Sequence, residues 1–145
     1  MKKKRLIGKI IIKNGISVQS IQFKKYLPVG SPKIAAEYLN RWGVDEIILL
    51  DIDASKIGKG PNLKLIRDIS NIIHTPLTVG GGIKRLDDVY SAIRAGADKV
   101  SINTSFFQNL NILDQTAKYF GSQSIVVSLD VSRDKQKNYK LFNKN

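Results

Sequence analysis

Three consecutive glycines, Gly80–Gly82, are the first candidates for chemistry in this chain. They follow the short apolar run Leu77–Val79. A second apolar run, Lys99–Ile102, leads directly into Asn103 and Thr104. Glycine backbone lets N–H groups approach an anion closely, and a helix that opens after such a turn adds a favourable dipole. We therefore predict that the two strand ends lie side by side, that a helix begins at the glycines, and that the site holds a phosphorylated small molecule.

Aspartates end two other apolar runs. Asp51 closes the run that begins at Glu46, and Asp130 follows the run Ser124–Leu129. Two carboxylates at separate strand ends can divide acid and base roles when their surroundings move their pKa values apart. Each is explained equally well as an aspartate that caps a helix or orders its own loop. The spacing alone leaves both interpretations open.

Metal and cofactor chemistry is not indicated. The chain has no cysteine, and His74 is its single histidine. A cysteine-based metal site is therefore excluded, and no second histidine is present to complete a histidine site. We expect neither a metal nor a cofactor.

The hydrophobic pattern alternates between strand-like and helix-like segments. Continuous apolar runs predict strands at Leu6–Ile12, Glu46–Asp51, Leu77–Val79, Lys99–Ile102 and Ser124–Leu129. Apolar residues at helical spacing predict helices that begin near Pro32 and Pro61, a third that opens at the glycines and carries Leu86 on its apolar face, and a fourth that includes Leu110. The remaining segments are expected to be a long polar loop, Lys13–Gly30, and a polar, hairpin-like end, Val131–Asn145.

The predicted fold class is α/β. Strands that are apolar throughout are buried on both faces, which is typical of a parallel sheet covered by helices. The order of elements fits a (β/α)8 barrel or a doubly wound sheet. A complete barrel needs about 250 residues, so residues 1–145 would form a single N-terminal portion of a barrel, with the C-terminal half absent. Its edge strands would lack neighbours, and we expect self-association or poor solubility.

The formal net charge of +12 is high for 145 residues. The basic residues are spread along the chain and lack the interleaved aromatic residues of an RNA-binding surface. An anionic substrate or an acidic protein partner is therefore favoured over nucleic acid. No apolar run approaches the ~20 residues of a membrane span, and no secretory leader follows the N-terminal MKKKR. We expect a cytoplasmic protein.

Four segments, LLDIDAS, PLTVGGGI, GADKVSINT and FGSQSIVVSLD, strongly resemble the cyclase subunit of imidazole glycerol phosphate synthase. That family is a (β/α)8 barrel of histidine biosynthesis, and the resemblance covers nearly the whole chain. It implies that Gly81, Gly82, Asn103 and Thr104 belong to one of the family's two phosphate sites. The second site would lie in the half of the barrel that is absent.

The same resemblance implies a glutaminase partner. Family members accept ammonia from a glutaminase docked at the bottom of the barrel, and the ammonia passes through the barrel to its top. Arg5, Glu46 and Lys99 match three of the four charged residues that gate this channel. Asp98 and Gln123 match positions near the glutaminase contact.

The chain departs from the family where catalysis would take place. Asp130 matches one of the family's two catalytic aspartates, and Asp51 is an auxiliary candidate, but the other catalytic aspartate falls on Ile11. Isoleucine cannot donate or accept a proton, so general acid–base catalysis at that position is lost. The family's substrate-holding lysine falls on Gln19.

One branch of the family shows this pattern. Its members belong to surface-polysaccharide gene clusters and act in acetamidino modification of sugars, where the barrel and its glutaminase supply ammonia to a separate sugar amidotransferase. The segments FKKYLPVGSP and LDIDASKIGKGPN resemble this branch more than the histidine enzyme. We therefore expect an ammonia-channelling role. The alternatives are a genuine cyclase (lyase) of histidine biosynthesis and an inactive, truncated half-barrel.

Overall fold

A computed structural model describes residues 4–141. Its strands are β1 (Ile7–Lys13), β2 (Ile16–Ile21), β3 (Lys25–Gly30), β4 (Glu46–Asp51), β5 (Leu77–Gly80), β6 (Lys99–Ile102), β7 (Ile125–Val127), β8 (Val131–Arg133) and β9 (Tyr139–Leu141). Its helices are α1 (Pro32–Arg41), α2 (Leu63–Ser70), α3 (Leu86–Arg94), α4 (Thr104–Gln108) and α5 (Asn111–Phe120), and a short 3-10 turn covers Ser122–Ser124. Helices separate the successive parallel strands, as predicted.

One sheet organises the fold, with its strands in the order β3-β2-β1-β4-β5-β6-β7. The strands β1, β4, β5, β6 and β7 are parallel to one another. Beyond β1, the strands β2 and β3 extend the sheet in antiparallel fashion. The repeated strand–helix units confirm the predicted fold class, a parallel α/β sheet that forms about the first five β units of a (β/α)8 barrel.

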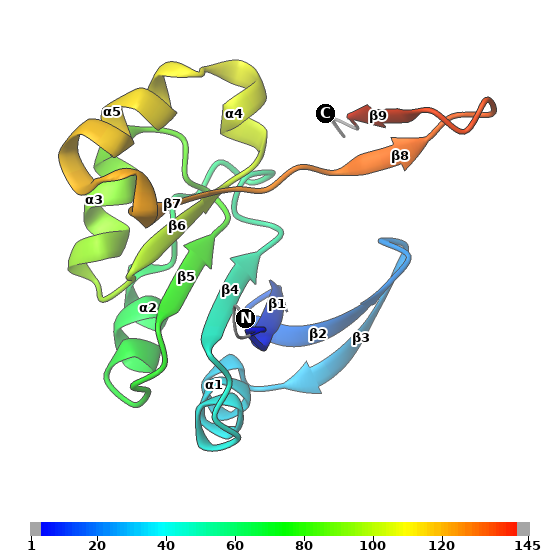
Figure 1. The fold of residues 1–145 in the computed structure, drawn as a ribbon. Coiled ribbons are helices and arrows are strands. Elements are labelled where there is room, and N and C mark those ends of the chain that lie inside the picture. The colour runs from blue at the N-terminus through cyan, green and yellow to red at the C-terminus, as the bar shows by residue number, and fades with distance from the viewer. Residues whose placement is uncertain (1–3, 142–145) are drawn as a thin grey trace.

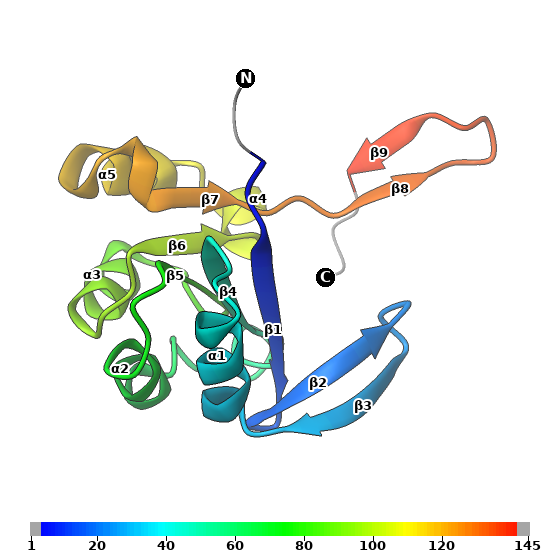
Figure 2. The same cartoon turned by 60° about the horizontal axis from the view of Figure 1, so that its bottom comes forward.

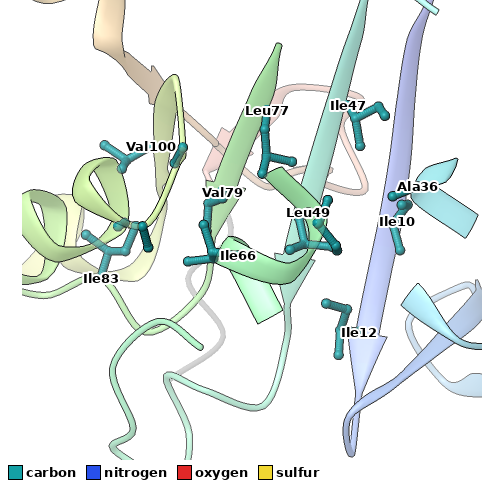
Figure 3. Close-up of a cluster of buried hydrophobic side chains, with 14 of the residues drawn as sticks. Ile10, Ile12, Ala36, Ile47, Leu49, Ile66, Leu77, Val79, Ile83 and Val100 are labelled. Carbon is teal, nitrogen blue, oxygen red and sulfur yellow. The ribbon is translucent and has the colours of Figure 1, made fainter. Parts of the chain in front are cut away.

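The helices cover one face of the sheet (Figures 1 and 2). Aliphatic side chains fill the space between them, among them Ile10, Ile12, Ala36, Ile47, Leu49, Ile66, Leu77, Val79, Ile83 and Val100 (Figure 3). Burying each large aliphatic side chain stabilises the fold by roughly 1.5–3 kcal/mol. This core fixes the strands, and with them the two ends of the sheet at which polar side chains gather.

The opposite, inner face carries the alternate residues of each strand. Ile10 and Ile12 belong to the core, so Ile11 between them faces the inner side. Ile47 is likewise a core residue, which turns the neighbouring Glu46 to the inner side. In a closed barrel this face is the interior. Residues from both ends of the sheet therefore share the surface that would line the barrel.

The segment Lys13–Gly30 is a hairpin of β2 and β3, so the prediction of a long polar loop was wrong. Ile16 and Val18 alternate with polar residues, which is the pattern of a strand with one solvated face. The turn between the strands places Gln22 and Phe23 at φ values of 51° and 57°. Turns of this left-handed kind normally use glycine or asparagine, so the residue types gave no turn signal.

Of the element boundaries that differ from the prediction, two bear on the candidate site. α3 begins only at Leu86 rather than at the glycines, because the Asp88 carboxylate accepts two backbone N–H groups just before it and fixes the start there. β7 is shorter than predicted, so Asp130 lies in the connection to β8.

The predicted hairpin at the end of the chain is formed by β8 and β9, which pair in antiparallel fashion. Figures 1 and 2 show it extending away from the helices. The last part of that prediction, residues 142–145, lies outside the described residues. Among the residues described, no helix has both the length and the apolar character needed to cross a membrane.

Candidate functional site

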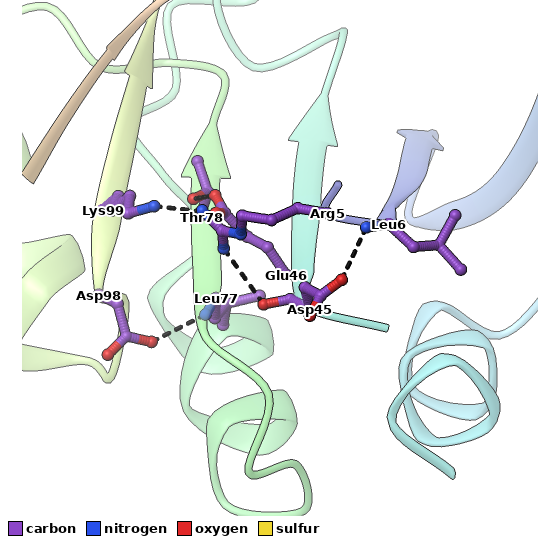
Figure 4. Close-up of polar contacts among 8 residues, drawn as sticks. All are labelled: Arg5, Leu6, Asp45, Glu46, Leu77, Thr78, Asp98 and Lys99. Atoms are coloured by element: carbon purple, nitrogen blue, oxygen red, sulfur yellow. Dashed lines mark hydrogen bonds and ion pairs between the residues drawn. The ribbon is translucent and has the colours of Figure 1, made fainter. Parts of the chain in front are cut away.

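A buried carboxylate lies at the amino-terminal end of the parallel strands. Glu46 opens β4, and its side chain is only 4% exposed. Its Oε2 atom accepts hydrogen bonds from Arg5 at 2.9 Å and from Lys99 at 2.8 Å (Figure 4). Its Oε1 atom accepts one from the Thr78 hydroxyl at 2.5 Å. The structure thus brings Arg5, Glu46 and Lys99 together, and we call these residues with Thr78 the charged cluster.

The surroundings of Glu46 favour its charged form. Burial by itself raises the pKa of a carboxyl group. Hydrogen bonds from Lys99 and Thr78, together with the charges of Lys99 and Arg5, outweigh burial and lower the pKa of Glu46 below its ordinary value of 4.5. At neutral pH, Glu46 is therefore an ionised acceptor held by two cations and a hydroxyl.

Thr78 is the member of the charged cluster that the sequence analysis missed. It is completely buried in β5 and pairs in register with Lys99 on β6. A signal was available, because a hydroxyl in the middle of a buried strand needs a hydrogen-bond partner. The sequence did not identify that partner, since Glu46 lies on a neighbouring strand.

Asp98 and Gln123 lie at the same end of the sheet. Asp98 precedes β6, and its Oδ2 atom accepts the backbone N–H of Leu77 at 2.7 Å (Figure 4). Gln123 precedes β7, and its side-chain amide donates to the Phe120 carbonyl at 3.2 Å. Both residues are exposed. Their remaining polar atoms are therefore available at the surface of the end that carries the charged cluster.

At the opposite end of the sheet, the glycine turn after β5 is packed too closely to hold side chains. Gly81 and Gly82 have φ values of 103° and 74°. A Cβ at Gly81 would lie 2.1 Å from the carbonyl oxygen of Asp51, and one at Gly82 would lie 2.4 Å from that of Lys59. Glycine is therefore required here by conformation and by packing against the β4–α2 loop. This packing therefore explains part of the triple-glycine sequence without an anion.

Two serine hydroxyls hold the glycine turn in place. The backbone N–H of Gly82 donates to Ser55 Oγ at 3.1 Å, which directs this donor at the β4–α2 loop. Ser105, in the first turn of α4, donates to the carbonyl of Ile83. The turn is thereby fixed between the loop that follows β4 and the helix that follows β6.

The residues predicted to hold phosphate lie at neighbouring strand ends. Gly81 and Gly82 follow β5, whereas Asn103 follows β6 and Thr104 begins α4. The Asn103 amide donates to Oδ2 of Asp130 at 3.2 Å. The exposed Asp130 therefore joins this group from the chain that leaves β7.

Asp51 orders its own loop. Its Oδ1 atom accepts the backbone N–H groups of Asp53 at 3.0 Å and Ala54 at 3.1 Å. Asp53 in turn accepts the backbone N–H of Asn14 at 2.9 Å and the Lys13 ammonium at 3.2 Å. Burial raises the pKa of Asp53, but these partners outweigh it and the pKa is lowered. Asp51 at the end of β4 thus orders the β4–α2 loop, which is its loop-ordering alternative, and Asp53 ties that loop to the end of β1.

An open groove of about 670 Å³ lies beside these carboxylates. Its polar lining comes from the ends of β1 and β4 and from the β4–α2 loop. It includes Asn14, Asp51, Asp53, Lys59 and Asn62.

Ile11 and Gln19, the two positions predicted to depart from the family pattern, lie on neighbouring strands. Ile11 pairs with Leu50 on β4 and with Val18 on β2. Gln19 lies on β2 and is exposed. The end of β1 therefore offers the inner face the aliphatic side chain of Ile11, the position at which the resemblance predicts the loss of a catalytic aspartate.

Comparison with known proteins gives the family of the chain. A model of the histidine biosynthesis protein family matches residues 5–144. A Vibrio vulnificus protein provisionally named imidazole glycerol phosphate synthase subunit hisF2 is 47% identical over 98% of this chain and 52% of its own length. The imidazole glycerol phosphate synthase subunits HisF of Clostridium beijerinckii and Dictyoglomus thermophilum are 41% and 42% identical, over 92% and 94% of this chain and 53% and 52% of their own lengths. The chain thus spans about half the length of these curated relatives. Since the family model matches nearly the whole sequence, the chain belongs to the histidine biosynthesis protein family.

Proposed function

We propose that the chain forms the N-terminal half of a (β/α)8 barrel that conducts ammonia from a glutaminase, and that it has lost the cyclase chemistry of its relatives. One observation carries the proposal. The charged cluster around Glu46 is assembled, while the end of β1 carries Ile11. The matched relatives are named as subunits of a synthase, which supports a partner subunit.

The charged cluster suits a gate at the entrance of a barrel. The side chain of Lys99 is 26% exposed and that of Arg5 is 51% exposed. Both cations are therefore already partly hydrated, and either can swing out into solvent. Glu46 is buried and is also held by Thr78, so it stays fixed. A small neutral molecule would pass when the Lys99–Glu46 contact opens. In this proposal Arg5 and Lys99 move, and Glu46 stays in place.

The proposed loss of cyclase chemistry rests on Ile11. General acid–base catalysis needs a titratable group within hydrogen-bond reach of the reacting atoms. Asp130 keeps a carboxylate after β7, but the inner face of β1 supplies none beside it. A single carboxylate cannot supply both a general acid and a general base held in two different environments. The substitution at Gln19 removes a cation that could hold an anionic substrate.

Phosphate binding at the ends of β5 and β6 is part of the proposal. Gly81 and Gly82 would approach the anion with their backbone, and Asn103 and Thr104 would donate from side chains. The Gly82 N–H points to Ser55, so an incoming phosphate would replace one hydroxyl acceptor by a charged one. Charge-assisted hydrogen bonds are the stronger kind, which favours that exchange.

The finer proposal is that the ammonia serves acetamidino modification of surface-polysaccharide sugars through a separate sugar amidotransferase, in the cytoplasm. It is supported by the segments FKKYLPVGSP and LDIDASKIGKGPN, and by the residues Ile11 and Gln19. A second candidate is a genuine cyclase of histidine biosynthesis. Family membership and the contact of Asp130 with Asn103 favour that candidate.

Co-purification with a glutaminase tests the proposal. A chimera would carry residues 1–145 in place of the matched half of the Clostridium beijerinckii subunit and would be expressed with that organism's glutaminase. We expect a stable complex that hydrolyses glutamine. We expect Lys99→Met to keep the complex but to leave the entrance open, so that ammonia passes into the barrel without control by the gate. A chimera that neither binds the glutaminase nor stimulates it would support the inactive half-barrel instead.

A further inference from the structure

The turn between β1 and β2 contains the only asparagine of the chain that a glycine follows. Lys13 pairs with Ile16, so Asn14 and Gly15 alone make the turn. Their φ values, 51° and 78°, are both positive, as a type I′ turn requires. Both residues are exposed, and among residues 4–141 no atom lies within 4 Å of a Cβ placed at Gly15. Solvent therefore reaches the Asn14 side chain and the peptide bond that follows it.

An asparagine followed by glycine can lose its side-chain amide without an enzyme. After base removes its proton, the backbone nitrogen of Gly15 attacks Cγ of Asn14, and a new carbon–nitrogen bond closes a succinimide ring. The bond from Cγ to Nδ2 breaks, and this nitrogen takes up a proton and leaves as ammonia. Water then opens the ring at one of its carbonyl carbons, which gives aspartate or isoaspartate at position 14. Glycine favours the reaction because it has no side chain to hinder the approach.

Asp53 restrains this turn. Its Oδ2 atom accepts the backbone N–H of Asn14 at 2.9 Å, and its Oδ1 atom accepts the Lys13 ammonium at 3.2 Å. The Asp53 side chain is only 16% exposed, so these contacts are partly shielded from water. Ring closure folds the Asn14 side chain back onto the next peptide nitrogen, which needs a backbone conformation outside the paired turn. The reaction therefore proceeds from the fraction of molecules in which the turn has opened.

We propose that Asn14 is a site of spontaneous deamidation, and that Asp53 sets its rate by holding the turn closed. Deamidation changes the open groove of about 670 Å³, which Asn14 lines together with Asp51 and Asp53. A third carboxylate there repels the two already present. Isoaspartate also adds one backbone atom to the turn and disturbs the pairing of Lys13 with Ile16. Both products therefore loosen the start of the β2–β3 hairpin.

Peptide mass spectrometry of the 145-residue chain, aged in mildly alkaline buffer, tests the proposal. Cleavage after lysine releases the peptide Asn14–Lys24, and its fragments distinguish Asn14 from Gln19 and Gln22. We expect Asn14 to be converted before any other asparagine, and faster still in urea, where the turn is unfolded. Earlier conversion of another asparagine, or an intact Asn14 in both states, would overturn the modification site. Equal rates in buffer and urea would overturn the restraint.

A matched pair of variants tests the role of Asp53. Asp53→Ala removes the acceptor of the Asn14 N–H, and we expect deamidation to become at least about fivefold faster, because hydrogen bonds to a charged group are the stronger kind. Asp134→Ala is the control, since Asp134 accepts the backbone N–H groups of Gln136 and Asn138, both at 2.9 Å, in the β8–β9 turn. We expect its effect on Asn14 to stay below about twofold.

Two further measurements separate a local restraint from general unfolding. Asp53→Asn keeps an acceptor oxygen, so its rate should lie between those of the parent and Asp53→Ala. In urea the parent and both Asp53 variants should react at the same rate, because the turn is then open in all of them. Equal acceleration by Asp53→Ala and Asp134→Ala, or a difference between the Asp53 variants that persists in urea, would overturn the restraint.

Discussion

The contact between Glu46 and Lys99 allows a quantitative test of the charged cluster. A double-mutant cycle would compare Glu46→Gln, Lys99→Met and the double variant. The two charged atoms lie 2.8 Å apart, and the side chains are 4% and 26% exposed. The pair Lys64–Asp68 on α2 is the matched control, because its atoms are also 2.8 Å apart but its side chains are 85% and 38% exposed. Burial is therefore the main difference between the two cycles.

The expected coupling follows from distance and burial. Unit charges about 4 Å apart interact by about 4 kcal/mol at an effective dielectric constant of about 20. Two effects reduce this figure, because Lys99 keeps part of its hydration and Glu46 keeps Arg5 and Thr78 after Lys99 is removed. We therefore expect a coupling of about 1–2 kcal/mol. For the control pair, water screens the charges, and we expect no measurable coupling.

Urea unfolding at pH 7 would measure each free energy of unfolding, first in low salt and then in about 1 M salt, where the Debye length is about 3 Å. The Glu46–Lys99 coupling should largely survive the salt, since the carboxylate is shielded from mobile ions. Equal couplings in the two cycles would refute the reasoning, because burial would then have no effect. So would a Glu46–Lys99 coupling that vanishes in high salt.

Three further outcomes are expected. Because the folded state lowers the pKa of Glu46 below its ordinary value of 4.5, its stabilising contribution is complete above that ordinary value and is lost as pH falls through the folded pKa. The urea midpoint should therefore drop less between pH 6 and pH 3 for Glu46→Gln than for the parent, and parallel profiles would contradict this. Gly82→Ala places a Cβ 2.4 Å from a backbone carbonyl, whereas Gly15, at a similar φ of +78°, has open space around it. Thermal unfolding should show losses of about 2–4 kcal/mol for Gly82→Ala and about 1 kcal/mol for Gly15→Ala, and equal losses would disprove the packing argument. Thr78→Val removes the hydroxyl that donates to the buried carboxylate of Glu46, and it should lower the free energy of unfolding by about 1–3 kcal/mol. NMR titration should show a raised pKa of Glu46 in Thr78→Val and an unchanged pKa in the control Thr78→Ser. An unchanged pKa in Thr78→Val would rule out the contact.

The parallel strands could be predicted because their sequences are apolar throughout. The run Glu46–Asp51 coincides with β4, and Lys99–Ile102 coincides with β6. The start of α1 at Pro32 was also readable, since proline is favoured at the first helical position. These signals are local, and each depends on residue types that favour one backbone conformation. The side chains that follow such strands were therefore correctly placed at the strand ends.

The remaining features depend on contacts between distant segments. The β2–β3 turn uses left-handed Gln22 and Phe23, residue types that carry no turn signal. Thr78 enters the charged cluster because parallel register sets it beside Lys99 on β6 and opposite Ile48 on β4, from where its hydroxyl reaches Glu46. The glycine turn looked like an anion site in sequence, but two of its glycines are already required by the backbone of the β4–α2 loop. No pattern of neighbouring residues in the sequence predicts that packing.

The central claim is that the chain retains a gated barrel entrance but lacks the carboxylate at the end of β1. The most direct test is a cyclase assay of the chimera that carries residues 1–145, before and after the paired substitutions Ile11→Asp and Gln19→Lys. The account predicts no cyclised product from the unmodified chimera with either ammonia or glutamine, and measurable cyclase activity once both residues are replaced. Cyclase activity in the unmodified chimera, within about tenfold (about 1.4 kcal/mol in barrier height) of the parent Clostridium beijerinckii subunit, would contradict it.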